Sequence, residues 1–249
     1  MILDIDMGNT RIKWRINDVD GRQWRQGACS AIADMLVDLS PLRHLLRRVR
    51  VSCVGREELL VTLDEWLHRQ DLPPCERARP TATLGGVRNG YTDHRQLGVD
   101  RWLALCAAYR LVSGACVVVD AGSAVTLDVV DATGLHHGGF IVPGLRLLKA
   151  SLRSGTERVA FTEAEADTEY DKTCGLGLGD STQVAVDHGT LFMLTAMVEK
   201  AVRDHCAGVP GACTLVLTGG DAPILAGKLS IPHRVVPDLV FQGIEIALP

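Results

Sequence analysis

The stretch Ile2-Leu3-Asp4-Ile5-Asp6, followed after one residue by Gly8-Asn9-Thr10, decides the fold. It is a short β-favouring run that ends in an aspartate, and a glycine-bearing turn separates it from a second β-rich run, residues 12–17. Two apolar runs on either side of such a turn predict a β-hairpin, with Asp6 at the end of its first strand.

The same plan returns about 114 residues later in a chain of 249 residues. Residues 116–120 (CVVVD) are apolar up to Asp120, Gly122 and Ser123 form the turn, and residues 124–130 are the second β-rich run. A chain of this length can bury a core in each of two halves. This internal repeat therefore predicts a duplicated domain, with residues 1–114 as the first half and residues 115–249 as the second.

The rest of the chain shows a mixed α/β pattern. The spacing of its apolar residues predicts helices within residues 31–49, 57–70, 101–113 and 180–205, and strands over residues 49–54 and 214–217. Residues 73–90 contain three prolines and four glycines or asparagines, which predict a loop. The fold class expected from the sequence is therefore α/β.

Charge and hydropathy exclude several classes of protein. The net charge is −4, with acidic and basic residues interspersed, which argues against nucleic acid as the main partner. Residues 44–50 (HLLRRVR) hold three arginines, which we interpret as the solvated face of a helix that runs into a strand. No run approaches about 20 apolar residues, and the N-terminus reads as a strand rather than a signal peptide. We expect a cytoplasmic protein with no membrane partner.

The eight cysteines do not predict a metal site. None forms a C-x-x-C pair, several lie in apolar stretches, and the histidines show no H-E-x-x-H spacing. Free cysteine behaves as a small buried hydrophobic residue, and cytosolic thiols stay reduced. We expect structural thiols rather than zinc ligands.

The two aspartate turns suit phosphate chemistry. Backbone N–H groups at a glycine turn can point at a phosphate, whereas the aspartate beside it calls for a cation such as Mg²⁺. Lys13 follows Asp6 in the returning strand, where its ammonium could neutralise phosphate charge, and Asn9 and Thr10 add side-chain donors. A single turn of this kind is also an ordinary hairpin turn, so the repeat carries the argument.

A third glycine turn, Thr218-Gly219-Gly220-Asp221, follows the last predicted strand. Its glycines can bring the backbone against a purine or a ribose. The alternative is a tight strand-to-helix turn that Asp221 caps. Two phosphate turns and one such turn, in this order, resemble the superfamily of acetate and sugar kinases and actin. That resemblance implies ATP use and two RNase H-like halves, with the nucleotide in the cleft between them.

Three further motifs resemble type III pantothenate kinase. They are Gly98-Val99-Asp100-Arg101, Tyr91 seven residues earlier, and residues 138–144 (GGFIVPG) after the second hairpin. Together with the first turn (DMGNTRIK, residues 6–13), they extend the resemblance from residue 2 to about residue 222. The family's reaction transfers a phosphoryl group from ATP to pantothenate, the first step towards coenzyme A.

The resemblance implies a role for each matching residue that contacts pantothenate. Asp100 would be the general base that takes the proton from the attacking hydroxyl, and Arg101 would pair with the substrate carboxylate. Gly98 and Val99 complete this element, and Tyr91 would pack along the pantoyl part. From the residues alone, Asp100 is equally an N-terminal helix carboxylate that only caps, and Tyr91 an amphipathic loop residue.

The resemblance also implies the ATP and cation sites. Asp6 would line the phosphate and metal region, and residues 8–13 would cradle the triphosphate, although Arg11 matches no family position that we can assign. Asp120 would hold a monovalent cation, K⁺ or NH₄⁺, beside Mg²⁺. Gly122 and Ser123 would contact phosphate, with Ser123 standing where the family usually has threonine, and the adenosine would lie against Gly219 and Gly220.

Thr182 matches a threonine that contacts pantothenate, in this family from the neighbouring subunit of a homodimer. A threonine at the start of a long helix is also an ordinary N-cap. The predicted helix within residues 180–205 is the candidate dimer interface, because its apolar residues cover more than one stripe.

Two other functions compete with this interpretation. Relatives of the Bvg accessory factor type were described as transcriptional accessory factors, so a nucleotide-binding regulator is one alternative. A phosphatase of the same fold that acts on phosphate chains, like exopolyphosphatases, is the other. The G-x-D-R element argues against the phosphatase, and intact Asp100, Arg101, Tyr91 and Lys13 argue for kinase chemistry.

Overall fold

The computed structural model describes residues 1–155, 174–206 and 213–249. Within these residues the chain divides into two compact units, Met1–Ala107 together with Asp238–Pro249, and Ala108–Pro237. The division differs from the expected halves in two ways. The N-terminal stretch of the first unit ends at Ala107 rather than at Gly114, and residues 238–249 at the C-terminus belong with the first unit.

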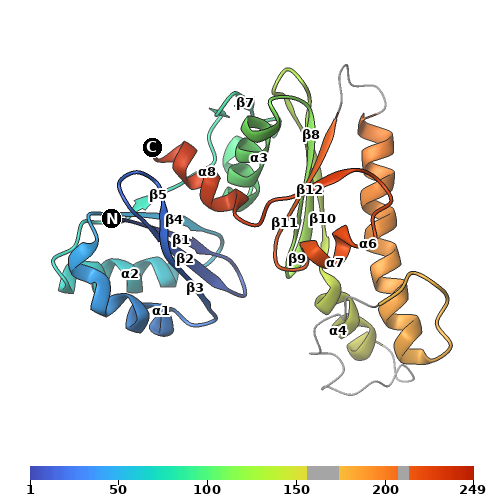
Figure 1. The fold of residues 1–249 in the computed structure, drawn as a ribbon, viewed down its shortest axis with the longest axis horizontal. Helices are drawn as coiled ribbons and strands as arrows, with labels where there is room; N and C mark the ends of the chain where they lie inside the picture. Colours follow the sequence, from blue (N-terminus) through green and yellow to red (C-terminus); the bar gives the residue numbers. More distant parts are fainter. Residues whose placement is uncertain (156–173, 207–212) are drawn as a thin grey trace. The chain divides into compact units, whose positions relative to one another are not determined.

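The first unit is built on a five-stranded mixed sheet with the order β3-β2-β1-β4-β5. The two predicted strands of the first hairpin are β1 and β2, which pair antiparallel, whereas β4 runs parallel to β1. Helices α1 and α2 lie on one side of this sheet and α8 on the other (Figure 1). The elements of the sheet and its helices are β1 (Ile2–Met7), β2 (Ile12–Asn17), β3 (Gln23–Cys29), α1 (Ile32–Leu39), β4 (Arg48–Cys53), α2 (Glu57–Arg69), β5 (Glu76–Arg77) and α8 (Leu239–Ala247).

The predicted loop at residues 73–90 contains only short extended pieces. After β5, strands β6 (Thr83–Leu84) and β7 (Val87–Arg88) form a small separate hairpin. A 3₁₀ turn, η2 (His94–Gln96), then leads into α3 (Val99–Val112), the helix predicted from residue 101. The predicted helix thus begins two residues earlier than its apolar pattern, because its first turn is made by the G-V-D-R element.

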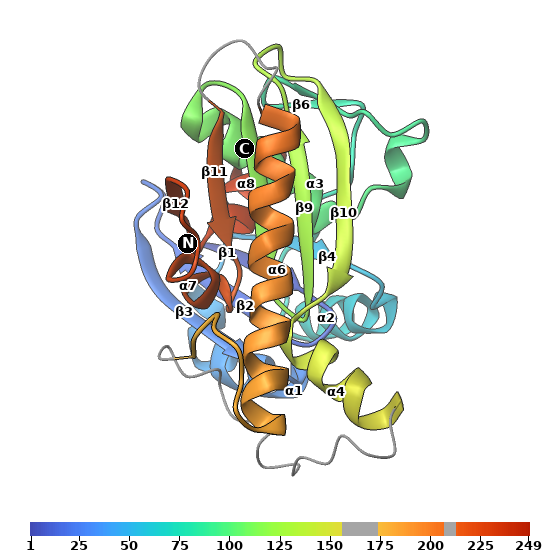
Figure 2. The ribbon, with the colours of Figure 1, turned by 90° about the vertical axis from the view of Figure 1, so that its right-hand side faces the viewer.

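The second unit repeats the sheet of the first. Its strand order is β10-β9-β8-β11-β12, with β8 and β9 antiparallel and β11 parallel to β8. The long helix α6 lies along one face of this sheet, as the two views in Figures 1 and 2 agree. The elements are β8 (Cys116–Ala121), β9 (Ala124–Val130), β10 (His136–Pro143), α4 (Leu145–Gly155), α6 (Thr182–Cys206), β11 (Thr214–Thr218), α7 (Ala222–Ala226) and β12 (His233–Val235).

The register confirms the duplication predicted from the two aspartates. Asp6 and Asp120 are each the last but one residue of the central strand. Asp6 faces Lys13 across the hairpin and Ser52 on the parallel strand, and Asp120 faces Thr126 and Thr218 in the same two ways. Two sheets with one strand order and equivalent aspartates are what a duplicated α/β fold requires.

Each unit has its own hydrophobic core. In the first, the inward residues of β1, β2 and β4 pack against α1 and α2, with Trp14 and Leu63 fully or almost fully buried. In the second, β8, β9 and β11 pack against α6 through residues such as Leu191, Leu194 and Val198. Burial of this kind supplies most of the favourable free energy of folding.

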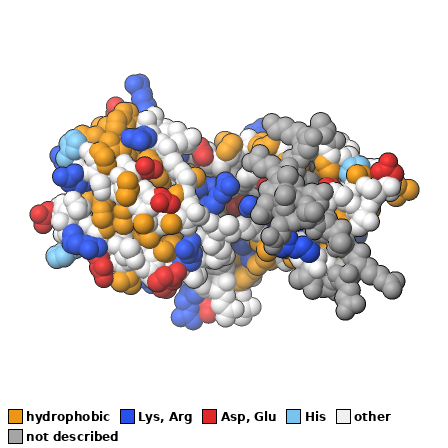
Figure 3. Space-filling view, turned by 90° about the horizontal axis from the view of Figure 1, so that it is seen from below, with side chains coloured by type: hydrophobic (Ala, Val, Ile, Leu, Met, Phe, Trp, Pro, Cys, Tyr) orange, Lys and Arg blue, Asp and Glu red, His pale blue; other side chains and the backbone are white. Residues whose placement is uncertain are grey.

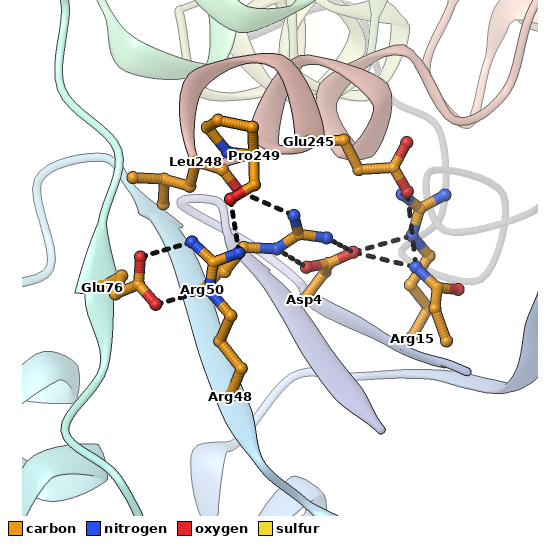
Figure 4. A network of polar contacts seen from close by, with 9 residues as sticks. Asp4, Arg15, Arg48, Arg50, Glu76, Glu245, Leu248 and Pro249 are labelled. Carbon is orange, nitrogen blue, oxygen red and sulfur yellow. Dashed lines mark hydrogen bonds and ion pairs between the residues drawn. The ribbon is translucent and has the colours of Figure 1, made fainter. Parts of the chain in front are cut away.

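A buried charge network joins α8 to the first sheet (Figure 4). Asp4 is fully buried and accepts hydrogen bonds from Arg50 at 2.7 and 3.1 Å, from Arg15 at 3.2 Å and from Asn17 at 3.1 Å. Arg15 also pairs with Glu245 of α8, and Arg50 donates to the carbonyl of Leu248. The carboxyl-terminal segment therefore packs on the first unit because its polar groups complete this network.

The interpretation of the arginine run at residues 44–50 was wrong for Arg50. Residues 40–45 form a 3₁₀ helix, η1 (Ser40–Leu45), so the helix predicted over residues 31–49 ends at Leu39 and β4 begins at Arg48. Arg50 lies inside β4 and is only 4% exposed. A buried arginine with a carboxylate partner has the same sequence appearance as a solvated one.

The cysteines also differ from the expectation at one pair. Cys206 and Cys213 form a disulfide, with 5.7 Å between their Cα atoms, which is an ordinary separation for such a bond. The other six cysteines are free. The pairing brings together the end of α6 and the residue before β11, and the sequence held no signal for it.

No helix of the described residues is long and apolar enough to cross a membrane. On the face drawn in Figure 3, Lys and Arg side chains are intermixed with Asp and Glu side chains. The mixed charge pattern expected from the sequence is thus present on that face.

Candidate active site

The first phosphate turn has the geometry of a tight hairpin loop. The backbone N–H of Gly8 donates to the carbonyl of Arg11 at 3.1 Å, which closes the turn between β1 and β2. Asn9, Thr10 and Arg11 are exposed at its tip. Asp6 and Lys13 are cross-strand neighbours at its base. The turn therefore presents short donors to solvent, with one carboxylate and one ammonium behind them.

Tyr91 and Arg101, both predicted substrate contacts, are brought together in the first unit. A guanidinium nitrogen of Arg101 donates to the Tyr91 hydroxyl at 3.1 Å, and the guanidinium carbon lies 5.8 Å from the centre of the Tyr91 ring. Arg101 is only 7% exposed. The Tyr91 ring and its hydroxyl thus help to hold the planar guanidinium in a fixed direction.

The position of Asp100 depends on the absence of a side chain at Gly98. Asp100 lies in the first turn of α3, and its Oδ1 accepts a hydrogen bond from the Arg101 N–H at 2.8 Å. A Cβ on residue 98 would lie 2.7 Å from the same oxygen, closer than non-bonded atoms allow. Glycine at this position therefore leaves room for the carboxylate of Asp100.

A cavity of about 530 Å³ lies in the first unit beside these residues. Its walls include the carboxyl end of β4, the start of α2, and Gly98 and Val99 at the start of α3. Gly55 in its wall faces the first phosphate turn, because a Cβ on Gly55 would lie 3.7 Å from the side-chain oxygen of Asn9. The cavity has a volume typical of small-molecule sites, and its wall includes Gly98 and Val99 of the G-V-D-R element.

The second phosphate turn is shorter than the first, with two residues between β8 and β9. The N–H of Gly122 donates to the carbonyl of Ala124 at 3.0 Å, and the N–H of Gly144, in the GGFIVPG motif, donates to the carbonyl of Ser123 at 2.9 Å. A Cβ on Gly144 would lie 2.1 Å from the carbonyl oxygen of Gly122. The glycine at the end of that motif thus allows α4 to begin directly against the turn.

Gly219 brings the third glycine turn against Asp120. Its φ of +94° is in the left-handed region, and a Cβ there would lie 2.3 Å from the carbonyl oxygen of Ala121 and 2.4 Å from Oδ1 of Asp120. The N–H of Asp221 donates to the same Ala121 carbonyl at 2.8 Å. Asp221 makes no side-chain cap on α7. The close packing of strand ends, rather than capping by Asp221, accounts for the glycine at position 219.

The two glycines of this turn make a matched test. We expect Gly219→Ala to destabilise the second unit by about 1–3 kcal/mol, because the residue is strained at positive φ, and to raise the KM for ATP. Gly220→Ala meets nothing within 4 Å and should leave stability nearly unchanged. Circular dichroism during denaturant unfolding measures the first quantity and steady-state kinetics the second. Equal stabilities for the two variants would contradict the packing argument.

Thr182 is the first residue of α6, but it does not cap the helix. The neighbouring Ser181 hydroxyl accepts a hydrogen bond from the Val184 N–H at 3.3 Å, so the capping role belongs to Ser181. Thr182 is exposed and lines a mostly apolar cavity of about 610 Å³ between α4 and α6. The described residues of that cavity's wall do not include Asp120, Gly122, Ser123 or Gly219.

The carboxylates that could bind a cation in this region, Asp6 and Asp120, do not belong to a cluster of metal-binding side chains in the described residues. The described residues contain no group of three or more His, Cys, Asp or Glu side chains that could hold a metal ion. Mg²⁺ in phosphate-transfer sites needs only one or two carboxylates, because substrate phosphates and waters complete its coordination. The half-buried Asp6 and Asp120 at their strand ends fit such a requirement.

Sequence reasoning did not assign the roles of Ser181 and Gly144. Ser181 rather than Thr182 caps α6, and Gly144 packs directly on the turn at Gly122. The GGFIVPG pattern includes Gly144, but the contact between Gly144 and the turn at Gly122 can be recognised only in the folded structure.

Comparison with solved structures shows the fold that this chain shares with other proteins. The fold is similar to that of a protein described as a Baf family transcriptional activator from Campylobacter jejuni, with a TM-score of 0.62, 23% identity, and coverage of 98% of this chain and 95% of that one. It is also similar to that of a protein described as a 2-dehydro-3-deoxygalactonokinase from Sinorhizobium meliloti (TM-score 0.58, 14% identity, coverage of 99% and 98%). The chain has the duplicated fold of the actin-like ATPases and sugar kinases, as expected.

Comparison of sequences defines the family. The type III pantothenate kinase family matches residues 2–204. A type III pantothenate kinase from Azotobacter vinelandii is 40% identical over 252 residues, which cover 100% of this chain and 99% of the relative. The chain belongs to the type III pantothenate kinase family, and it is an enzyme that uses ATP as phosphoryl donor and pantothenate as acceptor.

Proposed function

We propose that Asp100 is the general base of this kinase and that residues of both units bind the two substrates. The reaction converts ATP and pantothenate into ADP and 4′-phosphopantothenate. The hydroxyl oxygen of pantothenate attacks the γ-phosphorus, the bond from that phosphorus to the ADP oxygen breaks, and the hydroxyl proton passes to the Asp100 carboxylate. The observation that carries this proposal is the position of Asp100 in the first turn of α3, next to Arg101 and to the cavity that Gly98 and Val99 line.

Arg101 binds the pantothenate carboxylate in this proposal. Its guanidinium is buried and fixed by Tyr91, so that little side-chain freedom is lost when an anion binds. The two side chains come from α3 and from the loop before it, which places them near Gly98 and Val99 in the sequence and in the fold. The substrate contacts of the first unit therefore form one group.

ATP binds to the glycine turns in this proposal. The donors at Gly8, Asn9, Thr10 and Lys13 and those at Gly122 and Ser123 contact phosphate, and Gly219 and Gly220 face the adenosine. Asp6 lies with the phosphates and their Mg²⁺. Arg11 is included as an exposed cation at the tip of the first turn. Phosphoryl transfer needs mainly positioning and charge neutralisation, and a set of turns with backbone donors supports both.

A monovalent cation at Asp120 is part of the proposal. K⁺ or NH₄⁺ there would neutralise charge beside the phosphates, and the close contact of Gly219 with Asp120 restricts where the carboxylate can point. We expect Asp120→Ala to weaken or abolish activation by K⁺ or NH₄⁺, measured as turnover against salt concentration. Replacing KCl with a choline salt at constant ionic strength is the control. An unchanged cation dependence would place the ion elsewhere.

A homodimer in the cytoplasm completes the proposal. One stripe of α6 is buried in its own unit, whereas Phe192 and Met193 on the same helix are 56% and 49% exposed. Phe140 and Ile141 on the edge strand β10 are also exposed. Apolar side chains of this size favour a protein–protein interface, and a monomer in sedimentation equilibrium would contradict it.

ADP release by the purified protein tests the function. The assay contains Mg²⁺ and ATP, with and without pantothenate and with and without K⁺ or NH₄⁺. Formation of ADP that depends on pantothenate supports the proposal. ATP binding without that dependence would favour the nucleotide-binding regulator, and release of phosphate from polyphosphate would favour the phosphatase.

A further inference from the structure

His188 holds the segment that precedes α6 against that helix. Its Nε2 lies 3.1 Å from the backbone N–H of Gly175, and its Nδ1 lies 2.7 Å from the carbonyl oxygen of Gly177. A backbone N–H can only donate, so Nε2 is the acceptor and the ring proton lies on Nδ1, which donates to Gly177. One neutral imidazole therefore satisfies a donor and an acceptor two residues apart in residues 174–180.

The glycines of this segment allow its close approach to the helix. A Cβ on Gly175 would lie 3.1 Å from Cε1 of His188, which shows that the ring packs directly on the backbone there. A Cβ on Gly179 would lie 2.3 Å from the backbone nitrogen of Ala185. The segment is thus anchored to α6 at both ends, by His188 near its start and by the contact at Gly179 near its finish.

The anchored segment leads directly into the first turn of α6. Ser181 follows it, caps the helix through the Val184 N–H and accepts a second bond at its carbonyl from the Ala185 N–H at 2.8 Å. Thr182 comes next, with its side chain exposed. The first turn of a helix frays readily when the residues before it are not held. The order of Thr182 therefore depends on the residues that hold the segment.

We propose that His188 is a positioning residue for pantothenate binding, acting through residues 174–181 on Thr182. The proposal rests on the role of Thr182 as a pantothenate contact, which the resemblance to the type III pantothenate kinases implies and which we include in the proposed function. Without the imidazole, the first turn of α6 is ordered only when pantothenate binds. The free energy needed for this ordering reduces the net free energy of pantothenate binding. The predicted signature is a higher KM for pantothenate, with the KM for ATP and the kcat at saturating pantothenate retained.

The test compares three single variants of the full-length protein. In His188→Ala, the KM for pantothenate should rise about tenfold, as expected for the loss of two hydrogen bonds of ordinary strength. In His188→Gln, an amide that can both donate and accept should restore most of the wild-type KM. His68→Ala is the control, because it removes an exposed imidazole from the last turn of α2 in the first unit and should change none of the constants.

A double-mutant cycle with Thr182→Ala separates this inference from the proposed function. If His188 acts through Thr182, His188→Ala should add little to the KM of the Thr182→Ala protein. A Thr182→Ala protein with unchanged KM for pantothenate would overturn the role of Thr182 itself. A raised KM in Thr182→Ala but not in His188→Ala would overturn the inference about His188 alone. A similar rise in the KM values for pantothenate and ATP, together with a lower kcat and a lower melting temperature, would indicate a merely structural role for His188. That result would also overturn the inference.

Discussion

Asp100→Asn will lower kcat by about 10²–10⁴-fold, the range that general-base catalysis contributes, while the KM for pantothenate stays close to the wild-type value. The amide keeps the size of the side chain and its hydrogen bond to the Arg101 N–H, but it cannot take the hydroxyl proton. Binding through Arg101 and Tyr91 is untouched by the change. Steady-state kinetics with pantothenate as the varied substrate measures both constants.

The control for this variant is Asp34→Asn, which removes an exposed carboxylate from the first turn of α1. Carboxylates in a first helical turn contribute about 0.3–1 kcal/mol through the helix dipole, so both variants should lose similar, small amounts of stability. Only Asp100→Asn should lose turnover. Wild-type turnover in Asp100→Asn would rule out the general base and leave Asp100 as a helix carboxylate that only caps.

Asp4→Asn will destabilise the first unit by about 3–5 kcal/mol, the usual cost of removing one partner from a buried ion pair. Asp4 is the shared acceptor of Arg15 and Arg50, which are 7% and 4% exposed. Without the carboxylate, Arg50 still donates to the Leu248 carbonyl, and Arg15 still pairs with Glu245. Two cations would then remain buried with less compensation.

The position of the tryptophans makes this measurement specific. All four, Trp14, Trp24, Trp66 and Trp102, lie in the first unit, so their fluorescence during urea unfolding reports that unit. Asp93→Asn is the matched control, since Asp93 pairs with the exposed Arg95 at the surface, and such pairs contribute about 0–1 kcal/mol. Similar free energies of unfolding for the two variants would refute the importance of the buried network.

Much of the fold could be predicted from the sequence because its signals are local. A glycine turn between two apolar runs specifies a hairpin wherever it occurs, and the two hairpins lie where the pattern placed them. The long apolar helix α6 and the strand before Thr218 were predictable for the same reason. The candidate site followed from motifs, since Asp100, Arg101 and Tyr91 carry chemistry that a short pattern can encode.

Contacts between distant parts of the chain could not be predicted in this way. The arginine pattern at residues 44–50 is compatible with a solvated helix and with a buried strand. Burial of Arg50 depends on its ion-pair partner Asp4, which lies 46 residues earlier in the sequence. The disulfide between Cys206 and Cys213 and the packing of α8 on the first unit likewise depend on neighbours in space.

The sequence by itself determined the two aspartate turns and the α/β class, and it supplied the residues of the candidate active site, because hydrogen-bonding geometry and apolar periodicity act over a few residues. Only the tertiary structure decided that Ser181 rather than Thr182 caps α6, that Gly219 lies against Asp120, and that His188 holds the segment before the helix. The physical reason is that each of these depends on a steric or hydrogen-bond contact whose partner is specified by packing, and packing is a property of the whole folded unit.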